Sequence, residues 1–434
     1  MQQHEWRKDQ PDTVLTKEFL EILDLIEYTK QNVFITGVAG TGKSKLLTLL
    51  QLNTKKNFVV LAPTGVSALN VGGATIHSFF RLPIGLLKDE DENIKYNRRR
   101  VELYSKLDLV VIDEISMVRA DILDAIDYTL RLHRKSIAPF GGVQMLFFGD
   151  IMQLPPVVAG RNMQEYFEDN YGSPYFFDAH VYKQTHFVKT ELTHVFRQKD
   201  KSFIDLLNKI RLNQIDSDVL NILNSRYRGI DNISEDNVLT LCTTNKLSSE
   251  INDTKMAALN SKLYTYHADI QGDFDSKYYP TDSELSLKVG AQVMMLKNDP
   301  GQRWVNGTIG TIQELSDECV VMSTDNHTYE VPKATWELNE YIYDREQKKI
   351  EAKVIGSFTQ YPMKLAWAIT IHKSQGQTYE RVKINLGRGA FAHGQAYVAF
   401  SRCQSLEGIV LLTKITRRDI FVDPVVSNFV RAQE

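Results

Sequence analysis

One short stretch near the N-terminus constrains the fold more than any other part of the chain. Residues 37–44 read Gly-Val-Ala-Gly-Thr-Gly-Lys-Ser, which is the spacing of a phosphate-binding loop. The apolar run at 33–36 predicts a buried strand before the loop, and the leucine-rich run at 45–50 predicts a helix after it. Glycines let successive backbone N–H groups point at one anion, and the helix N-terminus adds positive potential. The stretch therefore predicts an α/β domain that binds a nucleotide.

The residue types within this loop suggest separate roles. Lys43 is placed to reach the β- and γ-phosphates, and the Ser44 hydroxyl is placed to ligate Mg²⁺. The alternative is a glycine-rich turn that holds no nucleotide, but the strand before it and the helix after it favour nucleotide binding. The predicted nucleotide-binding residues here are Gly37, Val38, Ala39, Gly40, Thr41, Gly42, Lys43 and Ser44.

Length and composition indicate an ordinary folded protein of several domains. The chain has 434 residues, of which 43% are hydrophobic and 24% are charged. No segment has the apolar length needed to span a bilayer, and the N-terminus lacks the apolar core of a signal peptide, so we expect an intracellular protein: cytoplasmic in a bacterium, nuclear or mitochondrial in a eukaryote. Cys242, Cys319 and Cys403 are widely spaced and odd in number, which excludes a cysteine-rich zinc site. A net charge of −3 leaves room for a nucleic-acid groove with a local basic lining.

Two further strand ends carry polar side chains beside the expected nucleotide. The buried run at 109–112 ends in Asp113-Glu114, where the first carboxylate would hold Mg²⁺ and the second would orient or deprotonate the attacking water. Another strand, at 144–148, is followed by Gly149-Asp150 and by Gln153, which can sense the γ-phosphate.

The first half also contains a candidate platform for single-stranded nucleic acid. A Pro63-Thr64 turn repeats the strand-turn-helix unit of a parallel sheet. Beyond it, His77 and Phe79 could contact phosphate and stack on a base, although periodicity alone favours a core phenylalanine and a surface histidine. Charged runs between residues 81 and 106 indicate a small inserted element.

The second half predicts another α/β domain with a β-rich insertion. A strand at 238–242 is followed by a polar loop with Asn245, and residues 260–360 give short β runs whose tyrosines we expect in a core or on a surface. His372 and Lys373 could cap a helix, but beside Ser374 and Gln375 we favour contact with nucleic-acid phosphate. Arg402 follows a strand-like apolar run, and a structural salt bridge is the alternative to a catalytic role.

Read in order, these segments resemble the motifs of superfamily 1 DNA helicases. Residues 139–142, Pro-Phe-Gly-Gly, are similar to the signature of the PIF (petite integration frequency) branch rather than to its RecD-like and Dda relatives, and the resemblance runs from about residue 15 to 415. Relatives carry a glutamine near position 19 for the adenine, whereas this chain has Glu18-Phe19. The segments that carry the resemblance are 37–44, 62–64, 113–117, 149–156, 191–198, 370–378 and 397–402.

The resemblance implies two RecA-like α/β domains with ATP in the cleft between them. The first would span 1–190, with the insertion at about 81–106 as a candidate strand-separating wedge, and the second would span 191–434, with a β-barrel-like insertion at about 260–360. Arg197 and Arg402 would reach the nucleotide from the second domain, and Gly376 would also contact it. The catalytic set is then Lys43, Glu114, Gln153, Arg197 and Arg402, the metal ligands are Ser44 and Asp113, and the DNA-binding set is Pro63, Thr64, His77, Phe79, Asn245, Thr370, His372 and Lys373.

The activity implied is that of an ATP- and Mg²⁺-dependent helicase. It would move 5′-to-3′ on single-stranded DNA as a monomer, unwind forked duplexes and G-quadruplexes, and serve DNA repair and telomere maintenance. Two other classes remain at this point: a P-loop kinase, which would need a phosphoryl-acceptor pocket, and a DNA-binding translocase that does not unwind. Retention of Lys43, Glu114, Arg197 and Arg402 together argues against a degraded relative.

Overall fold

The computed structural model describes residue 6 and residues 15–83, 85–87, 94–158, 160–198, 200–229, 238–324 and 327–432. These residues form two compact units. Unit 1 contains the described residues of 1–151, 155–196 and 338–355, and unit 2 contains those of 152–154, 197–337 and 356–432. The charged run predicted at 88–92 lies outside the described residues, and α5 (Arg98–Lys106) is the regular element described in the predicted 81–106 insertion.

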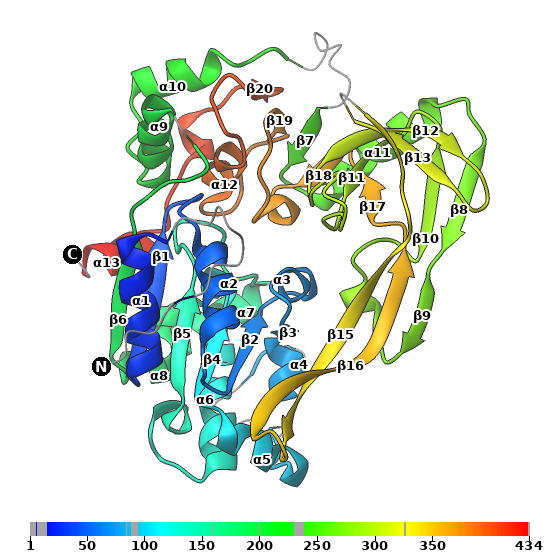
Figure 1. Ribbon diagram of the computed structural model, residues 1–434. Coiled ribbons are helices and arrows are strands. Elements are labelled where there is room, and N and C mark those ends of the chain that lie inside the picture. Colours follow the sequence, from blue (N-terminus) through cyan, green and yellow to red (C-terminus); the bar gives the residue numbers. More distant parts are fainter. Residues whose placement is uncertain are drawn as a thin grey trace. The chain divides into compact units, whose positions relative to one another are not determined.

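Unit 1 is built on a six-stranded sheet in which every neighbouring pair is parallel (Figure 1). The strands are β1 (Asn32–Gly37), β2 (Phe58–Ala62), β3 (Ala74–Thr75), β4 (Leu109–Ile112), β5 (Gln144–Phe148) and β6 (Phe187–Leu192). Their order is β3-β2-β4-β5-β1-β6. Strands β4 and β5 are buried throughout, as expected for a parallel sheet covered on both faces. The strands predicted from apolar runs are therefore confirmed.

The helices of unit 1 connect and cover these strands. The three- and four-residue spacing of apolar side chains at 13–31 predicts a helix with Thr16 as its cap. The helix is present as Lys17–Tyr28, and Thr16 Oγ1 accepts a hydrogen bond from the Phe19 N–H at 3.2 Å. The helices are α1 (Lys17–Tyr28), α2 (Lys43–Asn53), α3 (Gly65–Asn70), α4 (Ile76–Phe80), α5, α6 (Ala120–Arg134), α7 (Arg161–Asn170) and α8 (His180–Lys183), with 3-10 turns η1 (Ile115–Met117), η2 (Pro139–Gly142) and η3 (Phe176–Asp178).

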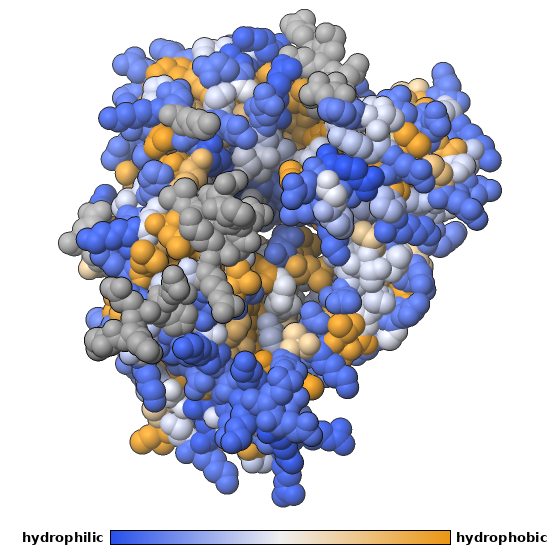
Figure 2. All heavy atoms as spheres, viewed as in Figure 1, coloured by the Kyte–Doolittle hydropathy of each residue, from blue (hydrophilic) through white to orange (hydrophobic). Residues whose placement is uncertain are grey.

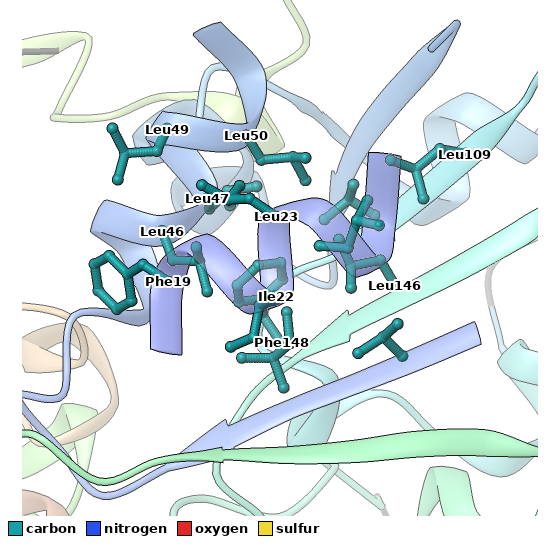
Figure 3. Packing of buried hydrophobic residues seen from close by; sticks show 14 of the residues in the cluster. Phe19, Ile22, Leu23, Leu46, Leu47, Leu49, Leu50, Leu109, Leu146 and Phe148 are labelled. Carbon is teal, nitrogen blue, oxygen red and sulfur yellow. The ribbon is translucent and has the colours of Figure 1, made fainter. Parts of the chain in front are cut away.

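The core of unit 1 joins α1 and α2 to the sheet. Figure 3 shows Phe19, Ile22 and Leu23 of α1 beside the leucines of α2, with Leu146 and Phe148 of β5 next to them. All of these side chains are almost completely buried. This packing fixes the start of α2, and with it the phosphate-binding loop, against the central strands.

A β-hairpin returns to unit 1 from far along the sequence. Its strands are β15 (Ala334–Asp344) and β16 (Lys349–Gln360), and residues 338–355 belong to unit 1, whereas the sequence analysis placed them in the second domain. The Tyr341 hydroxyl accepts a hydrogen bond from the Val60 N–H at 3.3 Å, and its ring packs edge-on against Phe79. Glu340 forms ion pairs with Arg81 and Arg100. These tertiary contacts could not be foreseen from local patterns.

Unit 2 contains a four-stranded parallel sheet of order β18-β7-β19-β20. Residues 395–401 form a helix, so the strand-like interpretation of the run before Arg402 is wrong. Every residue of this helix is buried, which removes the polar face that would have revealed helical periodicity. The elements are β7 (Leu239–Cys242), β18 (Ala368–Thr370), β19 (Val382–Asn385), β20 (Ile409–Leu411), α9 (Lys201–Arg211), α10 (Ser217–Asn224), α11 (Asn245–Ala258), α12 (Gln395–Ser401) and α13 (Pro424–Arg431), with 3-10 turns η5 (His372–Ser374) and η6 (Arg417–Asp419).

The predicted β-rich insertion is present, but its sheets are open. The strands are β8 (Leu263–His267), β9 (Asp269–Gly272), β10 (Glu284–Lys288), β11 (Gln292–Met295), β12 (Ile309–Leu315), β13 (Val320–Ser323), β14 (Thr328–Glu330) and β17 (Met363–Leu365), with the 3-10 turn η4 (Ser276–Tyr278). Strands β14-β13-β12-β11-β17 form one sheet, β15-β16-β9 a second and β10-β8 a third. No barrel closes within the described residues. The five-stranded sheet has the three-residue strands β14 and β17 at its two edges, and these strands do not pair with each other.

Candidate functional site

The phosphate-binding loop has the predicted context, with β1 entering it and α2 leaving it. Gly40 and Gly42 have φ values of 87° and 84°, a backbone conformation that suits glycine. Lys43 Nζ donates hydrogen bonds to the backbone oxygens of Gly37 at 2.6 Å and Val38 at 3.2 Å. Thr41 Oγ1 also donates to the Val38 oxygen, at 2.9 Å. The ammonium group thus lies over the loop, where it can bind an anion.

Aromatic side chains support the loop from behind. A Cβ added at Gly42 would lie 3.0 Å from the Phe19 ring and 3.2 Å from the Phe196 ring, so a larger residue would have to displace these rings. The Phe196 N–H donates to the Gly40 oxygen at 2.8 Å. The family pattern has an adenine-contacting glutamine near this position. Here Phe19 is 1% exposed and packs against the Phe196 ring. Glu18 beside it accepts a hydrogen bond from the Thr193 hydroxyl.

The acidic pair lies at the carboxyl end of β4, as predicted. Burial raises the pKa of Asp113, the negative charge of Glu114 raises it further, and the Lys43 ammonium opposes both effects. Glu114 adopts a left-handed backbone conformation, with φ 52°, which turns the chain sharply after the strand. An added Cβ at Gly149 would lie 2.9 Å from the Ile115 side chain, so glycine lets the end of β5 approach this turn.

These oxygen groups fit a magnesium ion. Ser44 and Asp113 offer a hydroxyl and a carboxylate, which are hard ligands of the kind that Mg²⁺ prefers. The raised pKa of Asp113 reflects a buried negative charge that a divalent cation would stabilise. No group of three or more His, Cys, Asp or Glu side chains among the described residues could hold a metal by itself, so the nucleotide and water would have to complete the coordination shell.

Arg197 and Arg402 meet at Ser401 within unit 2. Arg197 Nη1 donates to the Ser401 backbone oxygen at 3.1 Å, and Arg402 Nη2 donates to Ser401 Oγ at 3.0 Å. Arg402 is 2% exposed. Burial lowers the pKa of Arg197, and the nearby charge of Arg402 lowers it further. Two cations held this close together favour the binding of an anion.

Gln198 is a residue whose role the sequence analysis did not recognise. Its Nε2 donates to the backbone oxygens of Ser401 at 3.2 Å and Cys403 at 3.0 Å, and the side chain is 2% exposed. The amide therefore fixes the segment that carries Arg197 to the segment that carries Arg402. Its place directly after Arg197 in the 191–198 segment was the available signal.

Gln153 belongs to unit 2 by its packing, together with its two neighbours in 152–154. It is 5% exposed. A Cβ added at Gly394 would lie 2.3 Å from the Gln153 backbone oxygen, so only glycine fits where the loop before α12 meets this segment. Gly376, also predicted to contact nucleotide, lies on an exposed loop with φ 80°.

The DNA-binding residues predicted in unit 1 differ in accessibility. Thr64 is exposed and caps α3, because its Oγ1 accepts from the Ser67 N–H at 3.2 Å, and Pro63 beside it is half-buried. His77 is half-buried. Phe79 is 3% exposed and its ring packs edge-on against Phe80, Tyr104 and Tyr341. The structure thus favours the alternative interpretation of Phe79 as a core residue, and stacking of its ring on a base stays an untested prediction.

The predicted DNA-binding residues of unit 2 gather at one end of its parallel sheet. Asn245 follows β7 and begins α11, and Thr370 ends β18, the neighbouring strand. Thr370 Oγ1 accepts from the Lys373 N–H at 3.3 Å. Lys373 is exposed, whereas burial lowers the pKa of His372. Their contacts with DNA stay predictions.

The loop, the acidic pair and the parallel sheet define a class, the P-loop nucleoside triphosphatases. Residues 14–221 match the model of the PIF1-like helicase family, and residues 278–315 match that of the DNA helicase Pif1 2B domain. The ATP-dependent DNA helicase Pif1 of Bdellovibrio bacteriovorus is 32% identical over 97% of this chain and 92% of its own length. The chain therefore belongs to the PIF1-like helicase family.

Solved structures of related proteins agree with this assignment. Bacteroides sp. Pif1 in complex with ADP-AlF4 is 41% identical, with a TM-score of 0.90 over 97% of both chains. Bacteroides Pif1 bound to single-stranded DNA is 42% identical, and the structure of two coordinating Pif1 helicases at forked duplex DNA is 41% identical; each has a TM-score of 0.71 over 97% of both chains. The mouse DNA helicase PIF1 is longer: it is 35% identical over 88% of this chain, which spans 57% of its length. No helix in the described part of the chain is long and apolar enough to cross a membrane.

Proposed function

We propose that this protein is a DNA helicase that hydrolyses ATP and moves 5′-to-3′ along single-stranded DNA. The observation that carries the proposal is the acidic pair at the end of β4 beside a phosphate-binding loop whose lysine is already positioned over the loop. Duplex DNA is the proposed substrate, and G-quadruplexes are proposed in addition, with roles in DNA repair and telomere maintenance. The kinase alternative is not retained, because the chain belongs to a family of helicases.

Each residue of the ATP site has a proposed task. The loop N–H groups and Lys43 bind the phosphates, and Ser44 and Asp113 would hold Mg²⁺, which would neutralise phosphate charge. Glu114 accepts a proton from the attacking water or orients it. Gln153 senses the γ-phosphate, and Arg197 and Arg402 stabilise the charge that spreads over the transferring phosphoryl group.

DNA is proposed to contact loops that follow the parallel strands. In unit 1 these contacts come from Pro63, Thr64 and His77, and in unit 2 from Asn245, Thr370, His372 and Lys373. Hydroxyl, amide and cationic groups of this kind suit the phosphate backbone, which carries no sequence information. We propose that the protein acts as a monomer. Because one related structure contains two Pif1 helicases at a forked duplex, the unwinding assay below also measures how the rate depends on protein concentration.

An unwinding assay tests the proposal. Duplexes with a 5′ or a 3′ single-stranded tail are mixed with the protein, ATP and Mg²⁺, and strand separation is followed by fluorescence. We expect separation with the 5′ tail alone, with a rate linear in protein concentration for a monomer. Lys43→Ala should abolish ATP turnover and unwinding while its affinity for single-stranded DNA stays within about tenfold, or ~1.4 kcal/mol. Unwinding with the 3′ tail alone would contradict the proposed 5′-to-3′ direction. DNA-stimulated ATP turnover without strand separation would instead support a translocase that does not unwind DNA.

A further inference from the structure

A recess in unit 1 shares no residue with the phosphate-binding loop. Its volume is about 420 Å³, and it is formed by α5, the segment before α5, and one face of α6. Figure 1 places α5 and α6 at the lower end of unit 1, and Figure 2 shows hydrophilic residues gathered over that end. This volume lies within the range of pockets that hold small molecules.

The floor of the recess is aromatic and apolar. Phe80 and Tyr104 are 3% and 1% exposed, and their rings stack with centroids 5.8 Å apart at 28°. The Tyr104 hydroxyl donates to the Phe79 backbone oxygen at 2.8 Å, so its polar end is already satisfied. Tyr96, at the opening, is 43% exposed and stacks on His133 with centroids 5.2 Å apart at 19°. Phe80 and Tyr104 thus form a closed floor, and Tyr96 is the ring of these three that a flat ligand can reach.

The rim of the recess is cationic. Glu340 pairs with two of the basic side chains, Arg81 and Arg100. The other three are exposed, and no ion pair of theirs is found in the part of the chain that the structure describes. The five basic side chains that line the recess are Arg81, Lys95, Arg98, Arg99 and Arg100.

The one histidine in the lining adds no charge. His133 Nε2 lies 2.9 Å from the Asn97 backbone N–H and accepts its hydrogen bond, and Nδ1 lies 2.8 Å from the Thr129 oxygen, to which it donates. Burial lowers the pKa of His133, which agrees with a neutral ring. Among the described lining residues, the positive charge that no ion pair offsets therefore belongs to Lys95, Arg98 and Arg99.

We propose that this recess binds a nucleotide, with its base against the exposed Tyr96 ring and its phosphate on the arginines of the rim. A guanidinium group matches phosphate oxygens with two parallel hydrogen bonds, and aromatic rings stack on any base. A free nucleotide and a nucleotide within a DNA strand offer the same chemistry. The proposal does not depend on ATP hydrolysis, so it can fail while the proposed helicase activity stands.

Calorimetric titration with thymidine 5′-monophosphate tests the free-nucleotide source, with thymidine as the probe that lacks the phosphate. The titration is made without ADP, and binding of the monophosphate at the phosphate-binding loop is recognised by its loss in the Lys43→Ala variant, in which the recess is unchanged. The pocket variant is Arg98→Gln with Arg99→Gln. The matched control is Lys17→Gln with Arg161→Gln, which removes the same charge from side chains that are 91% and 89% exposed on other helices. We expect the pocket variant to lose roughly tenfold in affinity for the monophosphate, and the control to bind like the wild type.

Forked and single-stranded DNA distinguish the second source. If the nucleotide comes from DNA, the pocket variant should bind a forked duplex roughly tenfold more weakly than the control variant does, even where thymidine monophosphate shows no binding. Tyr96→Ala removes an exposed ring and should also weaken binding of the same probe. It replaces the double variant if that variant has a lowered melting temperature. Equal binding of both probes by wild type, pocket variant and control would overturn the proposal, and so would the absence of monophosphate binding together with unchanged affinity for forked DNA.

Discussion

Arg197 and Arg402 donate hydrogen bonds to different oxygen atoms of the same residue, Ser401. The two guanidinium groups are therefore held as a pair by one residue at the end of α12, through its backbone oxygen and its hydroxyl. The further hydrogen bonds of Arg402 go to the backbone oxygens of Val398 and Gln377. This arrangement suits two cations that act on one anion.

Arg197→Ala should leave ATP and DNA binding intact but remove most DNA-stimulated turnover, on the order of 10³-fold, by analogy with arginine fingers. Lysine should rescue poorly because a point charge cannot replace the planar fork. The measurement is the ATPase rate with and without single-stranded DNA. Full stimulation and unwinding in Arg197→Ala would leave the role to Arg402 alone.

Gln198→Leu should reduce the maximal ATPase rate with little change in ATP affinity. The substitution keeps most of the side-chain volume but removes the donors to Ser401 and Cys403, so the two arginines lose their common support. We expect a loss of roughly tenfold, equivalent to ~1.4 kcal/mol. Gln214→Leu, at an exposed position of the same unit, is the control. A Gln198→Leu enzyme with an unchanged maximal rate would show that this amide does not position the arginines.

Glu114→Gln should slow hydrolysis by roughly 10²- to 10⁴-fold while ATP still binds. The amide keeps the size of the side chain and leaves Asp113 in place, so only the proton acceptor is lost. Single-turnover hydrolysis and a nucleotide-binding titration measure the two quantities separately. Turnover near the wild-type rate would rule out Glu114 as the base.

Phe79→Ala should destabilise the protein more than it changes DNA affinity. The ring is buried among Phe80, Tyr104 and Tyr341, and truncation of a buried phenylalanine costs about 3–5 kcal/mol. His77→Ala and His372→Ala should instead weaken DNA binding and DNA-stimulated ATPase activity more than basal ATPase activity. Thermal melts and DNA titrations on the folded fraction distinguish a role of Phe79 in the core from a role in DNA binding. A normal melt of Phe79→Ala with a large loss of DNA affinity would restore the stacking role.

His133 should make the stability of unit 1 fall as the pH falls. Burial lowers the pKa of this imidazole in the folded state, so below about pH 6.5 the unfolded chain takes up a proton more readily than the folded one. When the pH is lowered from about 7.5 to about 5.5, the melting temperature of the wild type should therefore fall further than that of His133→Gln. His267→Gln, whose ring is 72% exposed, should behave like the wild type. Equal losses in wild type and His133→Gln would contradict this prediction.

The sequence predicts those parts of the fold that local spacing determines. The phosphate-binding loop, the Thr16 cap and the strand that ends before Asp113 each have a pattern of a few residues with one physical cause. Helix α12 could not be recognised, because a fully buried run has no polar side from which to read a period. The partners of Phe79 could not be recognised either, because Tyr341 reaches it from a distant hairpin whose register only the folded chain defines.

That hairpin also determines which pieces of the chain can be exchanged. A fragment that ends at Phe196 would lack residues 338–355, and with them the hydroxyl that satisfies the Val60 N–H and the carboxylate that pairs with Arg81 and Arg100. The buried N–H and the clustered arginines would then face water or one another, at a cost in stability. Unit 1 is thus built from three separate stretches of sequence. In a chimaera of two relatives, the hairpin should therefore come from the same parent as the phosphate-binding loop, so that these contacts are kept.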